Sequence, residues 1–405
     1  MTDAPHGTAS PGRGWLFLTA LVSITLVGPL AIHMYLPIMP SIQKAFSVST
    51  VLTTTTFSMV LFVMAFGTLV YGSASDRFGR KPVLMTGLGL FVAGSAVCAV
   101  AWNFEALIFG RLLQAMAAGC GVVLARAVAR DVYGPEKLSQ IIAYITAAYV
   151  LGPTFAPPIG GAISDVFGWN AVFLFATIVA VGVFVLAALV IRETHVNRRS
   201  ARRAGDLLSD YIRLLRNPVF VGYALNPAFT SGSFFVLATY ASFMMGDYYE
   251  ASSGEYGLYF MLLTFGFMAG NFISGRLGNS VQTDYMVIAG SVIGLITVEL
   301  LALAVFFFPQ QPLAIFLPGA LIGIAQGLSM PYAQAAAINA EPELTGTASG
   351  IVMAMNFLAA ALGSLFISML YDRTFLPMMV AIFGLCVLSI LSALFASACR
   401  RRRGY

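Results

Sequence analysis

Three ionisable side chains lie inside long apolar segments of the sequence: His33, Arg111 and Glu299. A charge in such a segment is costly, so these residues usually face a cavity or a partner. An imidazole has a reference pKa of about 6.5 and exchanges a proton near neutral pH. His33 therefore predicts a proton-transfer role. Arg111 and Gln114, three residues apart on one helix face, predict a polar wall of a binding cavity.

Each of these assignments has a plainer alternative. His33 also fits a neutral packing residue whose hydrogen bonds are satisfied. Arg111 also fits a side chain that reaches to a membrane surface, although it lies far from either end of its segment. For Glu299, the second proton-transfer candidate, a lipid-facing position or a misplaced helix edge explains the sequence as well as protonation does.

Further candidates for the cavity wall are polar and aromatic residues of the apolar segments. Aromatic and other adaptable side chains suit a site that accepts varied apolar ligands, but they are equally common as packing or lipid-facing residues. The candidates are Tyr35, Tyr144, Tyr149, Asn226, Phe234, Tyr240 and Asn356.

The composition indicates which elements must position these residues. Hydrophobic residues make up 59% of the 405 residues and charged residues only 10%, which excludes a soluble domain and a disordered chain. Lipid leaves no partner for an open backbone group, so the apolar segments must be helices. We expect an all-α membrane protein with twelve spans, near 15–38, 49–72, 82–101, 104–126, 138–164, 169–191, 218–246, 253–276, 284–308, 311–335, 344–370 and 375–399.

The basic residues support an even number of spans. With the N-terminus placed in the cytoplasm, Lys44 and Arg373 fall outside, Arg111 falls within a span, and every other one of the 22 Lys and Arg lies on the cytoplasmic side. This is the inside-positive pattern of membrane proteins, with both termini cytoplasmic. The net charge of +5 reflects that topology and does not indicate a nucleic-acid partner.

The long polar stretch 192–217 divides the spans into six and six. Its second part, from Asp206 to Arg216, has the apolar spacing of a short amphipathic helix on the membrane surface. The predicted organisation is a cytoplasmic tail, a six-helix bundle, a linker, a second six-helix bundle and a basic tail. Their bounds are 1–14, 15–191, 192–217, 218–399 and 400–405.

Neither a cofactor nor enzymatic chemistry is expected. The four cysteines form no CxxC or metal-ligand pattern, and no His cluster, Ser/His/Asp set or phosphate-binding loop is evident. The expected partners are a small-molecule substrate and the lipid bilayer, and the protein is expected to function as a monomer.

The segment between the second and third expected spans has a specific pattern, Gly-x-x-x-Asp-Arg-x-Gly-Arg. Its members are Gly72, Asp76, Arg77, Gly79 and Arg80. Gly275-Arg276-Leu277-Gly278 follows the eighth span, so the halves carry a faint internal repeat, as many transporters do. The pattern resembles the signature loop of the major facilitator superfamily. The resemblance implies two pseudo-symmetric six-helix bundles and a conformational gate in this loop.

The fifth expected span carries a second motif, in which prolines kink the helix and glycines permit close packing. The motif comprises Gly152, Pro153, Pro157, Gly160 and Gly161. It resembles the antiporter motif of drug:proton antiporters with twelve helices, and the resemblance implies that this span rocks during transport.

Three shorter segments resemble the Bcr/CflA (bicyclomycin/chloramphenicol resistance) family: Met34-Tyr35-Leu36-Pro37, Arg126 to Asp131, and Gly168-Trp169. The sequence departs from that family at His33, where the family usually has an aspartate that serves as a proton and cation site. An imidazole alternates between positive and neutral rather than neutral and negative. The substitution therefore disfavours cationic drugs and favours neutral or anionic substrates.

The resemblance implies a secondary transporter that exports small organic compounds across a bacterial inner membrane by alternating access, coupled to H⁺. Two alternatives stay open at this point. One is an importer of a nutrient, nucleoside or siderophore, by symport or facilitated diffusion. The other is a membrane receptor or scaffold that transports nothing. The sequence does not distinguish a proton from a sodium ion as the coupling ion.

Overall fold

The computed structural model describes residues 11–133, 135–194 and 204–402, and within these ranges every regular element is a helix. The first half comprises α1 (Pro11–His33), α2 (Met39–Phe46), α3 (Thr50–Phe78), α4 (Arg80–Ala99), α5 (Phe104–Val132), α6 (Pro135–Phe167) and α7 (Trp169–Val190). The helix α8 (Ala204–Leu215) follows. The second half comprises α9 (Pro218–Asp247), α10 (Ser253–Leu277), α11 (Thr283–Phe307), α12 (Leu313–Asn339), α13 (Thr345–Met369) and α14 (Leu376–Arg402). Short 3₁₀ turns lie at η1 (Leu36–Ile38), η2 (Gly278–Ser280) and η3 (Pro342–Leu344).

Twelve helices of the described residues are long and apolar enough to cross a membrane. The first of these spans runs from α1 through η1 into α2, because the chain is interrupted but not redirected near Pro37 and Pro40. The expected all-α fold with twelve spans is therefore confirmed. Residues 1–10, 195–203 and 403–405, which include most of the expected tails and the arginine-rich start of the linker, lie outside the described residues.

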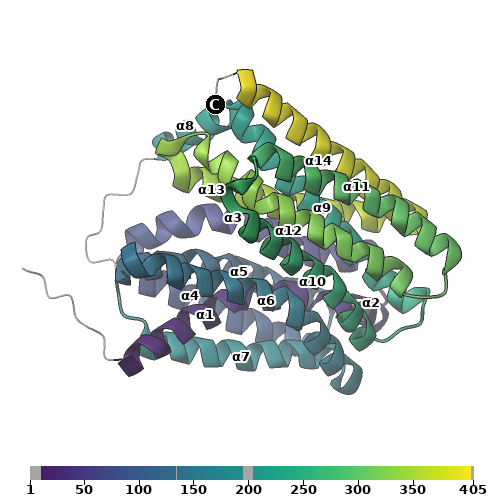
Figure 1. The fold of residues 1–405 in the computed structure, drawn as a ribbon. Helices are drawn as coiled ribbons and strands as arrows, with labels where there is room; N and C mark the ends of the chain where they lie inside the picture. The colour runs from purple at the N-terminus through teal and green to yellow at the C-terminus, as the bar shows by residue number, and fades with distance from the viewer. Residues whose placement is uncertain (1–10, 134, 195–203, 403–405) are drawn as a thin grey trace, which may run out of the picture.

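The twelve long helices form two groups, one from each half of the chain (Figure 1). Within the first half, α4 packs against α5 and α7; within the second, α12 packs against α10 and α11. The halves meet mainly at two helix pairs, α6 with α10 and α3 with α13, and α2 and η1 make smaller contacts with α9 and α10. The interface between halves is therefore made by a few helices, which leaves each half as a bundle of its own.

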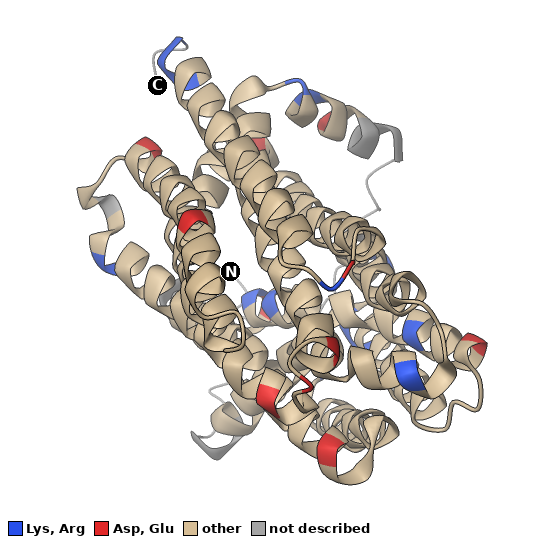
Figure 2. Ribbon diagram, turned by 90° about the vertical axis from the view of Figure 1, so that its right-hand side faces the viewer, with Lys and Arg blue, Asp and Glu red and all other residues tan. Residues whose placement is uncertain are grey.

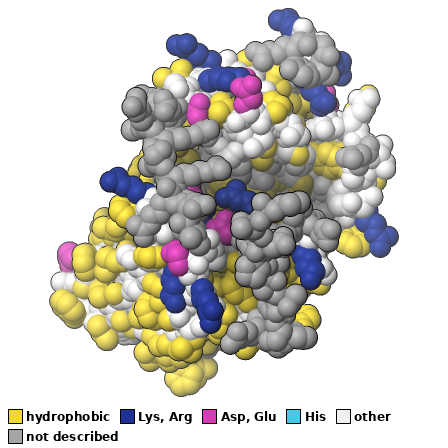
Figure 3. All heavy atoms as spheres, turned by 90° about the vertical axis from the view of Figure 1, so that its left-hand side faces the viewer, with side chains coloured by type: hydrophobic (Ala, Val, Ile, Leu, Met, Phe, Trp, Pro, Cys, Tyr) yellow, Lys and Arg dark blue, Asp and Glu magenta, His cyan; other side chains and the backbone are white. Residues whose placement is uncertain are grey.

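The two ends of the bundle differ in charge. We call the end where α1 begins, α8 lies and α14 ends the terminal face, and the other end the opposite face (Figure 1). Basic side chains are spread over the terminal face, with acidic ones beside them (Figure 3). The opposite face carries several acidic segments (Figure 2), and of the described Lys and Arg only Lys44, in the last turn of α2, and Arg373, between α13 and α14, lie at this end of the spans. This asymmetry agrees with the placement of Lys and Arg that the sequence predicts.

Side-chain caps fix where several helices begin. Ser49, Asn103 and Asn217 each accept a backbone N–H from the first turn of α3, α5 and α9. Ser252 and Glu255 form a reciprocal capping box at the start of α10. These caps satisfy backbone donors that lipid leaves without partners, so the polar residues between the spans determine the ends of the helices.

The helix α8 lies within the stretch for which the sequence predicts an amphipathic helix, and it packs against the second half. Leu214 is fully buried in a cluster formed by that half. Arg213 donates to Glu341 at 2.8 Å and to Glu343 at 3.0 Å, both in the connection between α12 and α13. The hydrogen bond that Arg213 donates to Glu343 and the negative charges of both carboxylates raise the pKa of Arg213. The linker helix therefore belongs to the second half.

In the second half, α10 and α12 approach so closely that a glycine is required between them. A Cβ atom added to Gly323 would lie 2.0 Å from the carbonyl oxygen of Leu263 and 2.7 Å from the backbone nitrogen of Phe267. Small residues at such crossings allow backbones to pack against each other in lipid, where packing contacts supply most of the helix association.

Replacing Gly323 with valine is expected to destabilise the second half by about 1–3 kcal/mol, because the added methyl groups force α10 and α12 apart. Thermal unfolding of the purified protein in detergent measures this as a lower midpoint. Gly182→Val is the matched control, because no described atom lies within 4 Å of a Cβ at that position in α7. Equal midpoints for the two variants would contradict the close-packing account.

Candidate functional site

The most deeply buried charge of the first half is Arg111 in α5, with a relative exposure of 1%. Its Nη1 donates to the carbonyl oxygen of Ala31 in α1 at 2.9 Å and to Oε1 of Gln114 at 3.0 Å. Gln114 in turn donates from Nε2 to Ser95 in α4 at 2.7 Å. The expected pairing of Arg111 with Gln114 on one helix face is thus present, and it ties α5 to α1 and α4.

An aromatic ring supplies the second support of this guanidinium. Arg111 Cζ lies 4.1 Å from the centroid of the Tyr35 ring, a cation–π distance. The Tyr35 hydroxyl hydrogen-bonds to the hydroxyl of Thr56 in α3, and its ring stacks parallel to that of Phe57 at 6.3 Å. Tyr35 is 1% exposed, so the expected cavity residue is in direct contact with Arg111 but is not itself open to solvent.

His33, the last residue of α1, lies where the two halves meet. It is buried, with its ring centroid 5.9 Å from that of Phe235 in α9 and 6.2 Å from that of Phe260 in α10. Phe57 of α3 also contacts Phe235, at 6.0 Å between centroids. Nδ1 of His33 has no hydrogen-bond partner among the described residues. The imidazole is therefore set among aromatic rings from both halves with an unused polar atom.

The motif of the fifth span places α6 between α1 and α10. Cβ atoms at Gly152 and Gly160 would lie 2.7 Å from Pro29 and 3.0 Å from the Met34 carbonyl oxygen in the α1 span. A Cβ at Gly161 would lie 2.2 Å from the carbonyl oxygen of Ser253 at the start of α10. Farther along the same contact, the backbone of Pro157 lies against Gly257 of α10, and Pro153 lies within the same stretch of α6.

Asp165, in the last turn of α6, reaches across to the second half, a contact that sequence reasoning missed. Its Oδ2 accepts from Ser252 Oγ at 2.7 Å and from the Gly254 backbone N–H at 2.8 Å, and its Oδ1 accepts from the Ser253 backbone N–H at 3.0 Å. A carboxylate at a helix N-terminus satisfies free backbone donors and complements the helix dipole. Asp165 thereby joins the two halves at the opposite face.

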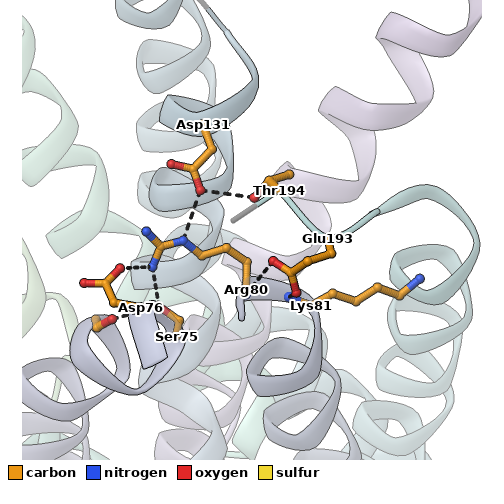
Figure 4. Close-up of polar contacts among 8 residues, drawn as sticks. Ser75, Asp76, Arg80, Lys81, Asp131, Glu193 and Thr194 are labelled. Atoms are coloured by element: carbon orange, nitrogen blue, oxygen red, sulfur yellow. Dashed lines mark hydrogen bonds and ion pairs between the residues drawn. The ribbon is translucent and has the colours of Figure 1, made fainter. Parts of the chain in front are cut away.

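At the terminal face, Arg80 is the centre of an ionic network within the first half (Figure 4). Arg80 is 3% exposed; its Nη1 lies 2.7 Å from Asp76, and its Nε donates to Asp131 at 3.0 Å. Its Nη1 also donates to Ser75 Oγ. By contrast Arg77 is exposed and stacks on the ring of Phe78 at 5.2 Å. Of the two arginines of this motif, only Arg80 holds the helices together.

The turn between α3 and α4 differs from the expected loop, because α3 continues through Asp76 to Phe78 and α4 begins at Arg80. Gly79 alone makes the turn, with φ of +102°, a conformation that side chains rarely adopt. Glu193, after α7, accepts from the backbone N–H of Arg80 at 2.9 Å and of Lys81 at 3.2 Å (Figure 4). It thus caps α4, so the signature segment is a helix junction and not a loop.

Asp131 and Glu193 are functional candidates that the sequence reasoning did not single out. Asp131 ends the segment from Arg126 to Asp131 that resembles the Bcr/CflA family, and this resemblance is the sequence feature that points to it. Its carboxylate also accepts a hydrogen bond from the Thr194 hydroxyl at 3.1 Å. Glu193 lies in the polar linker, where nothing in the local pattern distinguishes it. Gly72, expected to be part of the gate, has no described atom within 4 Å of a Cβ added there.

Two predicted cavity residues, Asn226 and Tyr240, and the second proton-transfer candidate, Glu299, lie elsewhere. Asn226 is fully buried within the second half, where its Nδ2 donates to Ser291 of α11 and to Ser389 of α14 at 2.9 Å each. Tyr240 donates to the carbonyl oxygen of Thr374 at 2.6 Å near the opposite face. Glu299 is exposed on α11, a helix that packs mainly on α12 and α14. The structure therefore does not bring these three residues to the Arg111 site.

The remaining predicted residues lie on α6, α9 and α13, helices that contact the other half of the chain. Phe234 packs edge-on against Phe260, one of the rings beside His33. Tyr149 interacts electrostatically with Arg126. Asn356 in α13 is buried, and its Oδ1 has no partner among the described residues. Tyr144 is exposed on α6 and accepts from Gln140.

Two bundles of membrane-spanning helices with buried polar groups between them define a membrane transport protein. The sequence model of the Major Facilitator Superfamily matches residues 21–246 and 228–404, so the chain belongs to this superfamily of transporters and not to an enzyme family. Among the described residues, no group of His, Cys, Asp and Glu is suited to hold a metal ion.

Relatives and solved structures agree with this assignment. The chain is 28% identical to a bicyclomycin resistance protein homolog of Haemophilus influenzae, over 95% of this chain and 96% of the relative. It is 26% identical to multidrug resistance protein D of Escherichia coli, over 83% and 84%. Its fold is similar to that of a D-xylose–proton symporter, with a TM-score of 0.74 at 15% identity, covering 95% and 97% of the chains. The resemblance to the bicyclomycin-resistance family is thus supported along the whole chain.

Replacing Arg80 with glutamine is expected to destabilise the protein by about 2–3 kcal/mol, because Asp76 and Asp131 then lose their common cation. The midpoint of thermal unfolding measures the loss. Arg77→Gln removes the same charge from an exposed site of the same motif and is expected to change stability by less than about 0.5 kcal/mol. Equal effects of the two substitutions would show that the motif acts through net charge alone.

Proposed function

We propose that this transporter exports small organic compounds across the bacterial inner membrane by alternating access, in exchange for protons. The names of the similar proteins, which refer to bicyclomycin and multidrug resistance, support export. The glycine- and proline-rich contact of α6 with α1 and α10 supports it as well, since it is a place where one helix packs closely against both halves.

The observation that carries this proposal is the buried group of His33, Tyr35 and Arg111, in which Tyr35 lies against Arg111 and His33 contacts the second half. A substrate site at the interface of two half-bundles becomes open to each side in turn when the bundles rock. In this proposal Arg111 and Gln114 position the substrate. His33 takes up and releases the proton, because its ring contacts helices of the second half and retains a free nitrogen.

The two ends of the bundle act as gates in this proposal. The network of Arg80, Asp76 and Asp131 keeps the terminal ends of α3, α4 and α5 together as one unit. The contacts of Gly161 and Asp165 with α10 close the opposite face. The abundance of Lys and Arg on the terminal face supports a cytoplasmic location for that face and for both termini.

The proposed organisation follows the predicted bounds, with half-bundles at 15–191 and 218–399, a linker at 192–217 and terminal segments at 1–14 and 400–405. The protein acts as a monomer in this proposal. Uptake by symport is the second candidate, and the imidazole at position 33 is the observation that favours it. Accumulation by everted vesicles but not by right-side-out vesicles supports export, and the reverse supports uptake.

Replacing His33 with alanine is expected to retain ligand binding but to abolish accumulation driven by a pH gradient, because the titratable group is lost. The ligand is one that stabilises the purified wild-type protein against heating, found in a chemically broad panel at two pH values. His33→Gln, which keeps a polar side chain of similar size but does not titrate, is expected to behave in the same way. If both variants keep the pH dependence of the wild type, the assignment of His33 is wrong.

Replacing Asp76 with asparagine is expected to slow transport severalfold while leaving the ligand Kd within about twofold, because the gate is remote from the site. Flux into everted vesicles and binding to purified protein are the two measurements. Glu105→Gln, which neutralises an exposed carboxylate at the other end of the same half, is the control. Parallel loss of affinity and flux in the Asp76 variant would contradict a gating role.

A further inference from the structure

We infer that the transported compound carries a negatively charged group and that Arg111 is its binding residue. This inference rests on the proposed transport function and adds the chemical class of the substrate. Arg111 is a buried guanidinium, and the described residues accept hydrogen bonds from only some of its N–H donors.

A guanidinium has five N–H donors in a planar fork and no acceptor. In Arg111 the Nη1 nitrogen is satisfied by Ala31 and Gln114. The Nε and Nη2 nitrogens are buried and have no hydrogen-bond partner among the described residues. These two nitrogens form the edge of the fork that binds a carboxylate or sulfonate in bidentate geometry, so the vacant part of the side chain has the shape of an anion site.

The same half shows how this protein treats a buried arginine that needs no ligand. Arg80 is buried to a similar degree, and the carboxylates of Asp76 and Asp131 both pair with it. Arg111 contacts a carbonyl, an amide and an aromatic ring, and none of the ion pairs among the described residues includes it. A buried charge without an opposite charge costs several kcal/mol, so Arg111 is best explained by an anion that arrives during transport.

The protein does not supply this anion from its described residues. Of the acidic side chains that the structure describes, all but Glu299 lie in the first or last turn of a spanning helix, in the linker helix α8 or in a connection between helices. Glu299 is exposed on α11. His33, the ionisable group at the junction of the halves, is neutral or positive and never negative. The interior is therefore electropositive, which attracts anions and repels cations.

A second cation on the same helix extends this electropositive region toward the terminal face. Arg126 follows Arg111 by fifteen positions, about 22 Å along α5, and the two side chains differ in direction by about 60°. It is partly buried, its Nε has no partner among the described residues, and it interacts with Tyr149 of α6. An anion that enters from this end meets Arg126 before Arg111. The inside-negative membrane potential favours the outward movement of such an anion.

Three probes that share one ring system and differ in charge test the inference: naphthalene-2-sulfonate, naphthalene-2-sulfonamide and 2-naphthyltrimethylammonium. Binding to the purified full-length protein is measured by calorimetry at two salt concentrations. The sulfonate is expected to bind at least about tenfold more tightly than the neutral or cationic probe. Binding of the sulfonate no tighter than that of the other two probes would overturn the inference.

Variants assign the anion to Arg111. Arg111→Gln is expected to lower sulfonate affinity at least about thirtyfold and to leave sulfonamide binding within about threefold. Arg111→Lys keeps the positive charge and is expected to retain part of the preference for the sulfonate over the sulfonamide. Arg126→Gln, at a less buried site, is expected to lower the rate at which the sulfonate enters. Arg130→Gln, an exposed arginine at the end of α5, is the control and leaves all values unchanged. A sulfonate preference that survives in Arg111→Gln would exclude Arg111 as the site.

Flux of the same probes into everted vesicles separates failure of this inference from failure of the proposed function. Transport of the sulfonamide or the ammonium probe in preference to the sulfonate would support the proposed export and contradict the inference that the substrate is an anion. Failure of all three probes to move, together with failure of the panel ligands, would remove both. An increase in sulfonate flux when the imposed membrane potential drives anions in the direction of export supports both the anionic substrate and the proposed function.

Discussion

The absence of water within a bilayer governs how this protein places its polar groups, because each buried donor or charge must find its partner inside the protein. Most such groups are satisfied within one half of the chain. Arg80 binds two carboxylates of the first half, and Asn226 binds Ser291 and Ser389 of the second. Since the polar bonding is largely complete within each half, the halves can move relative to each other without exposing unpaired groups to lipid.

The elements that carry the fold could be predicted from sequence because they depend on local composition. The apolar lengths predict all twelve spans to within a few residues, except that the first span continues to Phe46 and that α3 and α5 continue to Phe78 and Val132. The extensions of α3 and α5 carry Asp76 and Asp131. Charged residues end a hydropathy segment but do not end a helix, so the turn at Gly79 was placed in a loop several residues long.

The partners in the site could be predicted only in part. Arg111 and Gln114 are near in sequence, so helix geometry was sufficient to pair them. Glu193 lies more than a hundred residues from the Arg80 backbone that it caps, and no local pattern indicates such a contact. Asn226 was assigned to a cavity because it is polar within an apolar span. Nearly all of α9 is buried, so its polar residues face other helices as readily as a cavity.

The contact of Asp165 with α10 has a consequence for how sequence change tunes the opening of one end of the molecule. Two of its three donors are backbone N–H groups of Ser253 and Gly254, which ordinary substitutions in α10 leave in place. The strength of the contact is therefore controlled mainly from one position on α6, with Ser252 supplying the one side-chain donor. Replacing Asp165 with neutral, shorter or longer side chains would weaken the contact to different degrees. Such variants would shift the equilibrium between conformations that are closed and open at this face, without changing the residues of the substrate site.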